Sequence, residues 1–507
     1  MKLFFQQPNF PWQPERYHYA AEQMMLTLFP GEKPEYPADS PRKLEGEAVR
    51  FTLSRSETWA TLTAEVCREG KQERAFVRFP AAKLDAAPEQ VYHSVQHAVK
   101  MAFYKAGTAL LGQQPPWGAL TGVRPVKLPT RAMKRGLTPA QAKKELEREY
   151  HVSPVRAQLA LDCAKASLAV DNSLNPNEVS VYIGIPFCPT RCAYCSFVSA
   201  DVGRTLKMVE PYVQAMLTEI DATAAALKQA GLTVRSLYMG GGTPTTLSGS
   251  QMDRVLTRCE QVLPLEGCTE YTVEAGRPDT ITREKLEVLK AHHIGRISIN
   301  PQTLEDHVLS AIGRKHSAGD IQAAYALARE VGFDCINMDL IAGLPRDSFE
   351  GFCRSLDGVL AMEPENVTVH TLALKKGSAL MERRDLMPSG EEVAKMLEYS
   401  LSALRGRGYE PYYLYRQKYM SGSLENVGWA KPGTLSLYNI VMMEELHTVV
   451  SIGGGGVTKL VDPQAGKILR LPNPKFPHDY LATLDKVLGQ KDEIPAFYNG
   501  EREERDT

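Results

Sequence analysis

The stretch that decides the fold runs from residue 179 to residue 197. It reads Val179–Ser180–Val181–Tyr182–Ile183–Gly184–Ile185–Pro186–Phe187–Cys188–Pro189–Thr190–Arg191–Cys192–Ala193–Tyr194–Cys195–Ser196–Phe197. Residues 179–185 form an apolar, β-branched run, which predicts a buried strand. Three thiols with the spacing C-x3-C-x2-C follow at once, at Cys188, Cys192 and Cys195. The sequence therefore places three cysteines on a loop at the C-terminal end of a strand.

Three closely spaced thiols indicate a metal centre. Thiolates select soft metals and iron–sulfur clusters. A structural zinc site needs four nitrogen or sulfur ligands, usually in two separated pairs, and no histidine lies beside these cysteines. Three thiolates on a four-iron cluster leave one iron open to chelate the amino and carboxylate groups of a ligand. The remaining six of the nine cysteines are scattered and are expected to be small buried side chains: Cys67, Cys163, Cys259, Cys268, Cys335 and Cys353.

Similar apolar runs recur after this loop, and each is followed by a helical pattern. Six strands that alternate with helices predict an α/β fold with a parallel sheet and right-handed crossovers. Strands covered on both faces should be almost wholly apolar. Six units are fewer than a closed eight-stranded barrel needs, so we expect a partial (β/α)6 barrel or an open doubly wound sheet, with its chemistry at the C-terminal ends of the strands. The expected strands are 179–185, 234–239, 271–274, 296–300, 336–341 and 367–372.

Two further regions flank this core. Alternating runs at 47–53, 58–66 and 74–79, with helical patterns at 88–111, 139–150 and 154–169, predict an N-terminal α+β domain over residues 1–172. The polar stretch 171–177 is a linker, and the core follows over 175–385. From 386 to 507 the βα rhythm is lost, which predicts a mainly helical C-terminal appendage.

Composition excludes several classes of protein. The 507 residues are 43% hydrophobic and 23% charged, which is typical of a globular enzyme and not of a disordered chain. The 59 basic and 60 acidic residues nearly cancel, whereas dedicated nucleic-acid binders usually carry a basic excess. We expect no membrane span, because no run of 18 apolar residues occurs. The N-terminal apolar patch is too short for a signal sequence, so a cytoplasmic location is expected.

These motifs together resemble a known family. The cysteine spacing after the first strand of a βα array is the signature of radical S-adenosylmethionine (SAM) enzymes. The wider string from Tyr182 to Cys195 resembles the oxygen-independent coproporphyrinogen III oxidase family. An extra N-terminal domain, and Gly184 where many relatives have histidine, make the HemZ branch the most similar. Further matches follow in chain order: Gly240–Thr245, Val273–Ala275, Asn300–Gln302 and Asn337–Pro345.

The resemblance implies a role for each matching position. It implies a 4Fe–4S cluster on the three cysteines, SAM contacts from Gly241, Gly242 and Thr243, and a ribose contact from Glu274. Structural alternatives are a helix-end cation for Arg314 and a helix cap or internal salt bridge for Asp339. A second SAM molecule is implied at the positions Tyr194, Gln302, Arg314, Asp339 and Ala373.

The resemblance also implies the reaction. In the family, reductive cleavage of SAM leads to removal of hydrogen from a propionate β-carbon, and loss of CO2 then leaves a vinyl group. The implied partners are a tetrapyrrole substrate and a low-potential electron donor such as flavodoxin or ferredoxin. Four substrate carboxylates need cationic contacts. The candidate cations are Arg204, Lys375, Lys376, Arg383 and Arg384.

One departure leaves alternatives open. The best-studied decarboxylases carry a fourth cysteine where this chain has Phe197. A haem-binding chaperone of the same superfamily is a second hypothesis, although residues 436–443 lack the histidine and the Tyr-Trp pair of the chaperone motif H-N-x-x-Y-W. Another radical reaction on a tetrapyrrole is a third. An RNA-modifying radical enzyme is disfavoured by the balanced charge.

Overall fold

A computed structural model describes residues 1–6, 10–13, 15–37, 40–195, 200–373, 386–417, 424–463 and 466–500. The chain forms two compact units. Unit 1 comprises residues 1–161 with 416–424, and unit 2 comprises 162–415 with 425–507. The division falls within helix α5 (Pro154–Asp171), before the expected linker. None of the helices in the described ranges combines the length and the apolar character that crossing a membrane requires.

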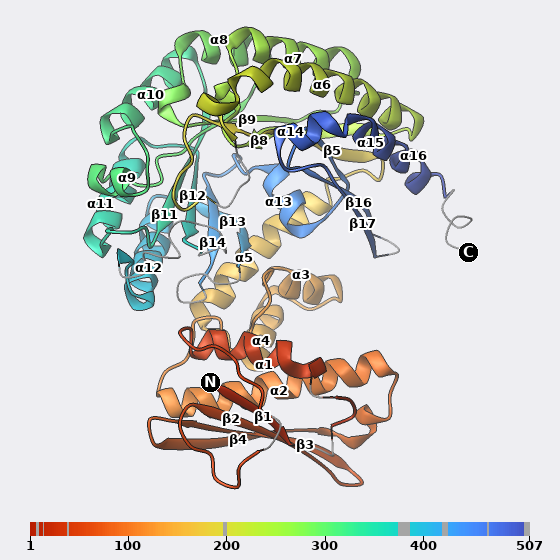
Figure 1. Cartoon of the computed structure of the whole chain (residues 1–507), viewed down its shortest axis with the longest axis vertical. Coiled ribbons are helices and arrows are strands. Elements are labelled where there is room, and N and C mark those ends of the chain that lie inside the picture. The colour runs from red at the N-terminus through yellow and green to blue at the C-terminus, as the bar shows by residue number, and fades with distance from the viewer. Residues whose placement is uncertain are drawn as a thin grey trace. The chain divides into compact units, whose positions relative to one another are not determined.

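Unit 1 is an α+β domain with a four-stranded sheet in the order β1–β2–β3–β4. Helices α1 (Glu15–Leu28) and α2 (Pro88–Leu111) lie together on one face of this sheet (Figure 1). Buried side chains such as Val95, Phe103 and Phe51 join α2 to the sheet. The other elements are β1 Lys2–Gln6, β2 Ala48–Arg55, β3 Trp59–Arg68, β4 Lys71–Pro80, η1 Ala81–Leu84, α3 Lys127–Lys134 and α4 Pro139–Tyr150.

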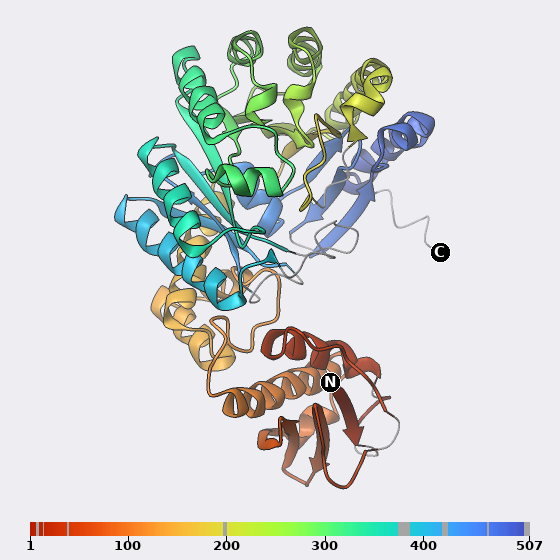
Figure 2. The same cartoon turned by 60° about the vertical axis from the view of Figure 1, so that its left-hand side comes forward.

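Unit 2 contains the expected (β/α)6 partial barrel. Its six parallel strands are neighbours in chain order, as right-handed βα crossovers require, and all six predicted strands are present. Figures 1 and 2 show helices α6 to α11 as an arc around the outside of the curved sheet. The strands are β5 Glu178–Ile185, β8 Thr233–Gly241, β9 Glu270–Gly276, β10 Arg296–Ile299, β11 Cys335–Ala342 and β12 Asn366–Thr371.

The helices of this arc follow the strands in alternation. Several begin at a serine or threonine whose hydroxyl accepts a backbone N–H of the first turn, for example Ser248 before α7 and Ser317 before α10. The elements are α6 Val202–Gln229, η2 Pro244–Thr246, α7 Gly249–Val262, η3 Pro278–Thr280, α8 Arg283–Ala291, α9 Asp306–Ala311, α10 Ala318–Val331 and α11 Phe349–Ala361. The short strands β6 Phe187–Cys188 and β7 Ala200–Asp201 pair beside the sheet.

The C-terminal region contains more helix than strand, but the expectation of an appendage is wrong. Its strands extend the main sheet at both ends, where β14 pairs with β12 and β15 pairs with β5. The strands are β13 Glu410–Tyr415, β14 Asn426–Ala430, β15 Val449–Ile452, β16 Val457–Asp462 and β17 Lys467–Pro472. The helices are α12 Gly390–Gly406, α13 Leu437–Glu444, α14 Pro477–Ala482, α15 Leu484–Gly489, η7 Gln490–Asp492 and α16 Glu493–Tyr498.

The sequence analysis expected parallel strands that are almost wholly apolar, but the observed strands also carry polar side chains. Alternate positions point to opposite faces of a strand. In β5, Val181 and Ile183 are fully buried, whereas Tyr182 faces the aromatic side chains of β8 and α13 on the inner side. Helix α13 lies inside the curve of the sheet, opposite the outer arc (Figures 1 and 2). The inner face therefore carries aromatic and polar groups, and apolar side chains of α13 pack against part of it.

A buried carboxylate ties the C-terminal region to the core. Glu219 of α6 is fully buried and accepts hydrogen bonds from the Gly453 N–H at 2.7 Å, Asn473 Nδ2 at 2.9 Å and the Tyr480 hydroxyl at 2.6 Å. The ammonium of Lys491 forms an ion pair with it at 2.7 Å. A buried charge is tolerable only when it is paired and hydrogen-bonded, and Glu219 satisfies both conditions.

We expect Glu219→Gln to lower the thermal unfolding midpoint, because it leaves the buried Lys491 ammonium without an anionic partner. Removing one member of a buried ion pair costs about 3–5 kcal/mol. The control is Glu210→Gln, since Glu210 pairs with Arg254 on the surface and its side chain is 50% exposed. Such surface pairs contribute about 0–1 kcal/mol. Equal shifts of the midpoint in both variants, measured by circular dichroism, would contradict this assignment.

Candidate active site

The loop with three cysteines is attached to the glycine run that follows β8. The Gly242 N–H donates to the Ile185 carbonyl and the Thr243 N–H donates to the Phe187 carbonyl, both at 2.8 Å. Thr243 Oγ1 lies 3.5 Å from the sulfur of Cys188. A Cβ on Gly242 would lie 2.5 Å from the Phe187 oxygen and 3.0 Å from that sulfur. Only glycine permits this approach of the two strand ends.

The rest of the loop is held by two buried arginines. Arg277, at the end of β9, donates to the carbonyl and hydroxyl of Thr190 at 3.1 and 2.8 Å and pairs with Asp279 at 2.7 Å. Arg314 donates to the Asn300 carbonyl at 2.6 Å and to the Tyr194 hydroxyl at 3.1 Å. Arg314 therefore does not serve as a cation at the end of α9, which was the structural alternative. Both side chains fix the loop against the C-terminal ends of β9 and β10.

The donor set suits an iron–sulfur cluster. In the described part of the chain, no three His, Cys, Asp or Glu side chains are close enough together to hold a single metal ion. Ligands to separate irons of one cluster do not need to meet at one point, and three thiols without a carboxylate beside them favour iron–sulfur over a hard cation. Burial raises the pKa of the Cys335 thiol to about 11 and also raises that of Cys268, which fits the expectation that these cysteines are buried side chains.

Glu274 projects from β9 into the barrel beside the glycine run. The Tyr238 hydroxyl donates to its Oε1 at 2.6 Å, and the Gly241 N–H also hydrogen-bonds to it. Burial raises the pKa of Glu274 to about 7. The nearby Asp339 carboxylate raises it as well, whereas the two hydrogen bonds and His370 lower it. Glu274 is therefore poised to titrate near neutral pH.

Asp339 of β11 lies inside the same end of the barrel. It accepts a hydrogen bond from Asn337 Nδ2 at 2.8 Å, and its Oδ2 lies 3.7 Å from His370 Nε2. Burial favours the protonated form, but His370, Asn337 and Thr368 outweigh burial and hold the pKa of Asp339 below its usual value. The other nitrogen of His370 lies 3.4 Å from the Tyr415 hydroxyl. The position of His370 is the one that an internal salt bridge, one of the structural alternatives for Asp339, would need.

Backbone hydrogen bonds connect Gln302 to Asp339, and the backbone of Gln302 adopts an uncommon conformation. Its N–H donates to the Asp339 carbonyl at 2.8 Å, and its carbonyl accepts the Ile341 N–H at 2.9 Å. These bonds form an isolated bridge to β11, and Gln302 adopts a positive φ of 69°. Such a conformation is uncommon for a residue other than glycine and persists where the surroundings impose it. Ala373 follows the end of β12, the strand that carries His370.

Three tyrosine side chains are grouped together near these carboxylates, and we call them the tyrosine floor. The ring centroids of Tyr238 and Tyr438 are 4.3 Å apart with planes inclined by 16°, and Tyr182 lies within 6.4 Å of each ring. Tyr182 comes from β5, Tyr238 from β8 and Tyr438 from α13. Burial raises the pKa of each phenol. The three remain neutral hydrogen-bond donors at physiological pH.

The structure thus brings most of the predicted residues to one end of the barrel. The cysteine loop, the glycine run and Glu274 form one group. Gln302, in the loop after β10, bonds to Asp339 on β11, and Arg314, after α9, bonds to the Asn300 carbonyl at the end of β10. Several predicted positions lie outside the described residues: Phe197, Lys375, Lys376, Arg383, Arg384 and the side chain of Arg204.

Sequence analysis missed four residues of this site. His370 ends an apolar strand, which was the same signal that identified Glu274. Tyr238 lies two residues before the glycine run, so the sequence could have placed it near the site. Tyr415 and Tyr438 come from the C-terminal region, and no local pattern shows that they reach the barrel interior.

The site also explains why residue 184 is glycine. A Cβ there would lie 2.7 Å from the Gly454 carbonyl, which belongs to the turn between β15 and β16. The Tyr212 hydroxyl bonds both sides of this contact, donating to the Gly184 carbonyl at 2.7 Å and accepting the Gly454 N–H at 2.6 Å. The turn therefore fills the space that a side chain at position 184 would use.

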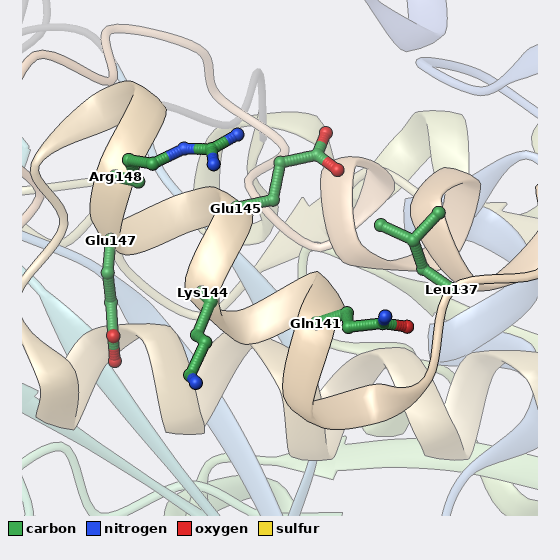
Figure 3. Close-up of a pocket in the computed structure, with 6 residues that line it drawn as sticks. All are labelled: Leu137, Gln141, Lys144, Glu145, Glu147 and Arg148. Carbon is green, nitrogen blue, oxygen red and sulfur yellow. The ribbon is translucent and has the colours of Figure 1, made fainter.

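A surface pocket in unit 1 is unrelated to this site. It has a volume of about 560 Å³. Figure 3 shows that its charged groups point in different directions and do not converge on a common point. None of the predicted site residues lines it: the lining consists of Leu137, Gln141, Lys144, Glu145, Glu147 and Arg148.

Comparison with known proteins agrees with this geometry. Residues 182–356 match the Radical SAM superfamily. The chain is 38% identical over 448 residues to the oxygen-independent coproporphyrinogen-III oxidase-like protein HemZ of Bacillus subtilis (strain 168), covering 87% of this chain and 89% of that protein. It is 34% identical over 238 residues to the heme chaperone HemW of the same organism, covering 46% of this chain and 62% of the chaperone.

A solved structure supports the fold. The coproporphyrinogen III oxidase HemN from Escherichia coli, described as a radical SAM enzyme, aligns with a TM-score of 0.51 and 23% identity over 64% of this chain and 72% of that chain. The match to HemZ runs through nearly the whole length of both proteins, and the superfamily match covers the cysteine loop with β8 to β11. On these grounds the chain belongs to the radical SAM superfamily and, within it, to the family of HemZ, the oxygen-independent coproporphyrinogen-III oxidase-like protein.

Proposed function

We propose that this chain catalyses the oxygen-independent oxidative decarboxylation of coproporphyrinogen III to protoporphyrinogen IX. Membership of the radical SAM superfamily implies a 4Fe–4S cluster and SAM. The observation that carries the proposal is the pair of polar groups at one end of the barrel. One surrounds Glu274 beside the cysteine loop. The other contains Asp339 with Gln302, and Arg314 with Tyr194, at the ends of the next strands.

The first group suits SAM on an open iron. Cys188, Cys192 and Cys195 would hold the cluster, and the backbone of Gly241 to Thr243 would contact the amino and carboxylate groups of SAM. Glu274 would accept hydrogen bonds from the ribose hydroxyls. When bound, the cluster and SAM supply the abstraction of a hydrogen atom, and the protein contributes position and exclusion of water. The stacked rings of Tyr182, Tyr238 and Tyr438 supply apolar surface beside this group.

The second group suits another anionic or hydroxyl-bearing ligand, and we assign it to a second SAM. Arg314 is a buried cation that donates to a carbonyl and a phenol and also interacts with the Cys192 thiol, and a ligand carboxylate nearby would complement its charge. Asp339 would accept hydroxyl groups, with Gln302, Tyr194 and Ala373 around it. Each propionate loses one hydrogen atom, CO2 and one electron to become a vinyl group. Two propionates react, so two abstractions are needed per substrate molecule.

The electron that starts each abstraction must come from outside the chain. We assign this role to a low-potential one-electron carrier of the flavodoxin or ferredoxin class. The substrate is a tetrapyrrole with propionate groups, and its final electron would pass to a separate acceptor. No nucleic acid takes part, in keeping with the balanced overall charge.

A haem-binding chaperone is the second candidate function, because HemW proteins are among the relatives. Residues 437–444 form α13, whose Tyr438 stacks on Tyr238 inside the barrel. This segment has neither the histidine nor the Tyr-Trp pair of the chaperone motif. The argument for a decarboxylase is stronger, because the segment that matches the chaperone motif lacks its distinguishing residues.

The deciding experiment is anaerobic turnover of coproporphyrinogen III by the reconstituted protein. Mass spectrometry should show loss of two CO2, with about two 5′-deoxyadenosine molecules per protoporphyrinogen. Asp339→Asn should slow product formation by at least about tenfold, because it removes a charged hydrogen bond, while the iron content stays unchanged. Stoichiometric haem binding without CO2 release, reproduced with several electron donors, would favour the chaperone.

A second prediction concerns the cluster. Single alanine substitutions at Cys188, Cys192 and Cys195 should abolish the brown absorbance shoulder and the iron bound after anaerobic reconstitution, because each removes one of three ligands. Cys259→Ala and Cys268→Ala should retain about four irons per chain. Equal loss of iron in these two controls would show that the assignment of ligands is wrong.

A third prediction concerns Glu274. Glu274→Ala should weaken SAM binding by about 1–3 kcal/mol, because a charged hydrogen bond to the ribose is lost. Equilibrium dialysis of the reconstituted protein measures this as an increase in Kd of roughly 5- to 150-fold. The cluster absorbance should be unchanged. An unaltered Kd would exclude the ribose role.

A further inference from the structure

Tyr238 occupies a position that no motif of the family points to. It lies on β8 two residues before the glycine run, and its hydroxyl donates to Glu274 Oε1 at 2.6 Å. A phenol that donates to a carboxylate forms a charge-assisted hydrogen bond, which is stronger than a neutral one. Among the described residues, no lysine or arginine forms an ion pair with Glu274. The phenol of Tyr238 and the Gly241 N–H are therefore the donors that stabilise its charge.

The other groups around Glu274 shift its pKa in opposite directions. Asp339 on β11 is a like charge that favours protonation of Glu274, and His370 on β12 opposes this. The phenols of Tyr182 on β5 and Tyr438 on α13 also lie near the carboxylate, without a hydrogen bond to it. Burial is the largest influence and favours the protonated form, so losing the hydrogen bond from Tyr238 would raise the pKa of Glu274 further.

The C-terminal region holds Tyr238 in place. The ring of Tyr438 stacks on that of Tyr238 at 4.3 Å, which limits the directions in which the phenol can point. Tyr438 is itself fixed, since the carboxylate of Glu270 accepts the N–H groups of Leu437 and Tyr438 and the hydroxyl of Ser436 at 2.7 to 3.1 Å. Arg296 lies 3.9 Å from Glu270 and donates to the carbonyl that precedes Ser436. Helix α13 is thus locked into the barrel at its first turn.

We infer that Tyr238 is a positioning residue for Glu274: its hydroxyl holds the carboxylate ionised and in one orientation, and Tyr438 holds Tyr238. Tyr238 occupies one acceptor position of Oε1, and a carboxylate with four acceptor positions keeps others for hydroxyl groups of the bound ligand. The inference rests on the proposed function only in naming that ligand as SAM. The hydrogen bond and the stack belong to the protein without ligand.

The first test titrates Glu274 directly. Infrared difference spectroscopy follows the carbonyl band of the protonated carboxyl from pH 5 to 9, and Glu274→Gln identifies that band. The hydrogen bond from Tyr238 stabilises the ionised form, so its loss in Tyr238→Phe should move the midpoint upward from near pH 7 by about one pH unit. Tyr438→Phe is the matched control, because it keeps the stacked ring and removes a hydroxyl that does not bond Glu274. Its midpoint should equal that of the wild type.

The second test measures SAM binding by the reconstituted protein over the same pH range. Ribose hydroxyls donate to the ionised carboxylate, so wild-type affinity should rise as pH increases through about 7 and then reach a plateau. In Tyr238→Phe the rise should occur about one pH unit higher and reach the same plateau. General structural damage would instead lower the affinity at every pH.

The outcomes separate the inference from the proposed function. If the carboxyl of Tyr238→Phe titrates with the wild type, or if Tyr438→Phe shifts equally, the positioning role is wrong. If SAM fails to bind the wild type at any pH, the proposed function is wrong, while the infrared midpoints still decide the role of Tyr238.

Discussion

The site depends on the backbone hydrogen bonds that join the ends of β5 and β8. Parallel neighbours end at the same edge of a sheet, so the loop after β5 and the glycine run after β8 meet there. The N–H groups of Gly242 and Thr243 then attach the run to the carbonyls of Ile185 and Phe187. This contact has no room for a side chain on Gly242. The place of the first thiol is therefore set by main-chain geometry.

The inner face of the barrel is polar, and polar groups inside a protein destabilise it unless they are bonded. Here the partners come from neighbouring strands: Tyr238 with Glu274, and Asn337 and His370 with Asp339. The two carboxylates lie near each other, but their surroundings shift their pKa values in opposite directions. Burial lifts the pKa of Glu274 to about 7, whereas its partners hold that of Asp339 low. Two neighbouring acidic residues of one barrel thus lose their protons at different pH.

The C-terminal region completes the site from a distance in sequence. Its strand β15 pairs with the strand that leads to the cysteines, and the turn after β15 takes the space that a side chain at Gly184 would fill. The buried Glu219 and Lys491 secure that turn from the outside. Helix α13 enters the barrel and supplies Tyr438 to the tyrosine floor. Replacing this region would alter the side chains that surround the site but leave the sequence of the cysteine loop unchanged.

The sequence alone determined the six parallel strands, the cysteine loop and the strand-end positions of Glu274 and Asp339. Apolar β-branched runs form strands through local propensity and burial, and motif residues lie within a few positions of each strand end. Only the tertiary structure decided that the C-terminal strands join the same sheet, that Arg314 binds Tyr194 and that Tyr438 stacks on Tyr238. Such contacts join residues far apart in the chain. The register and side-chain packing that create them depend on the whole fold and leave no periodic trace in the amino-acid order.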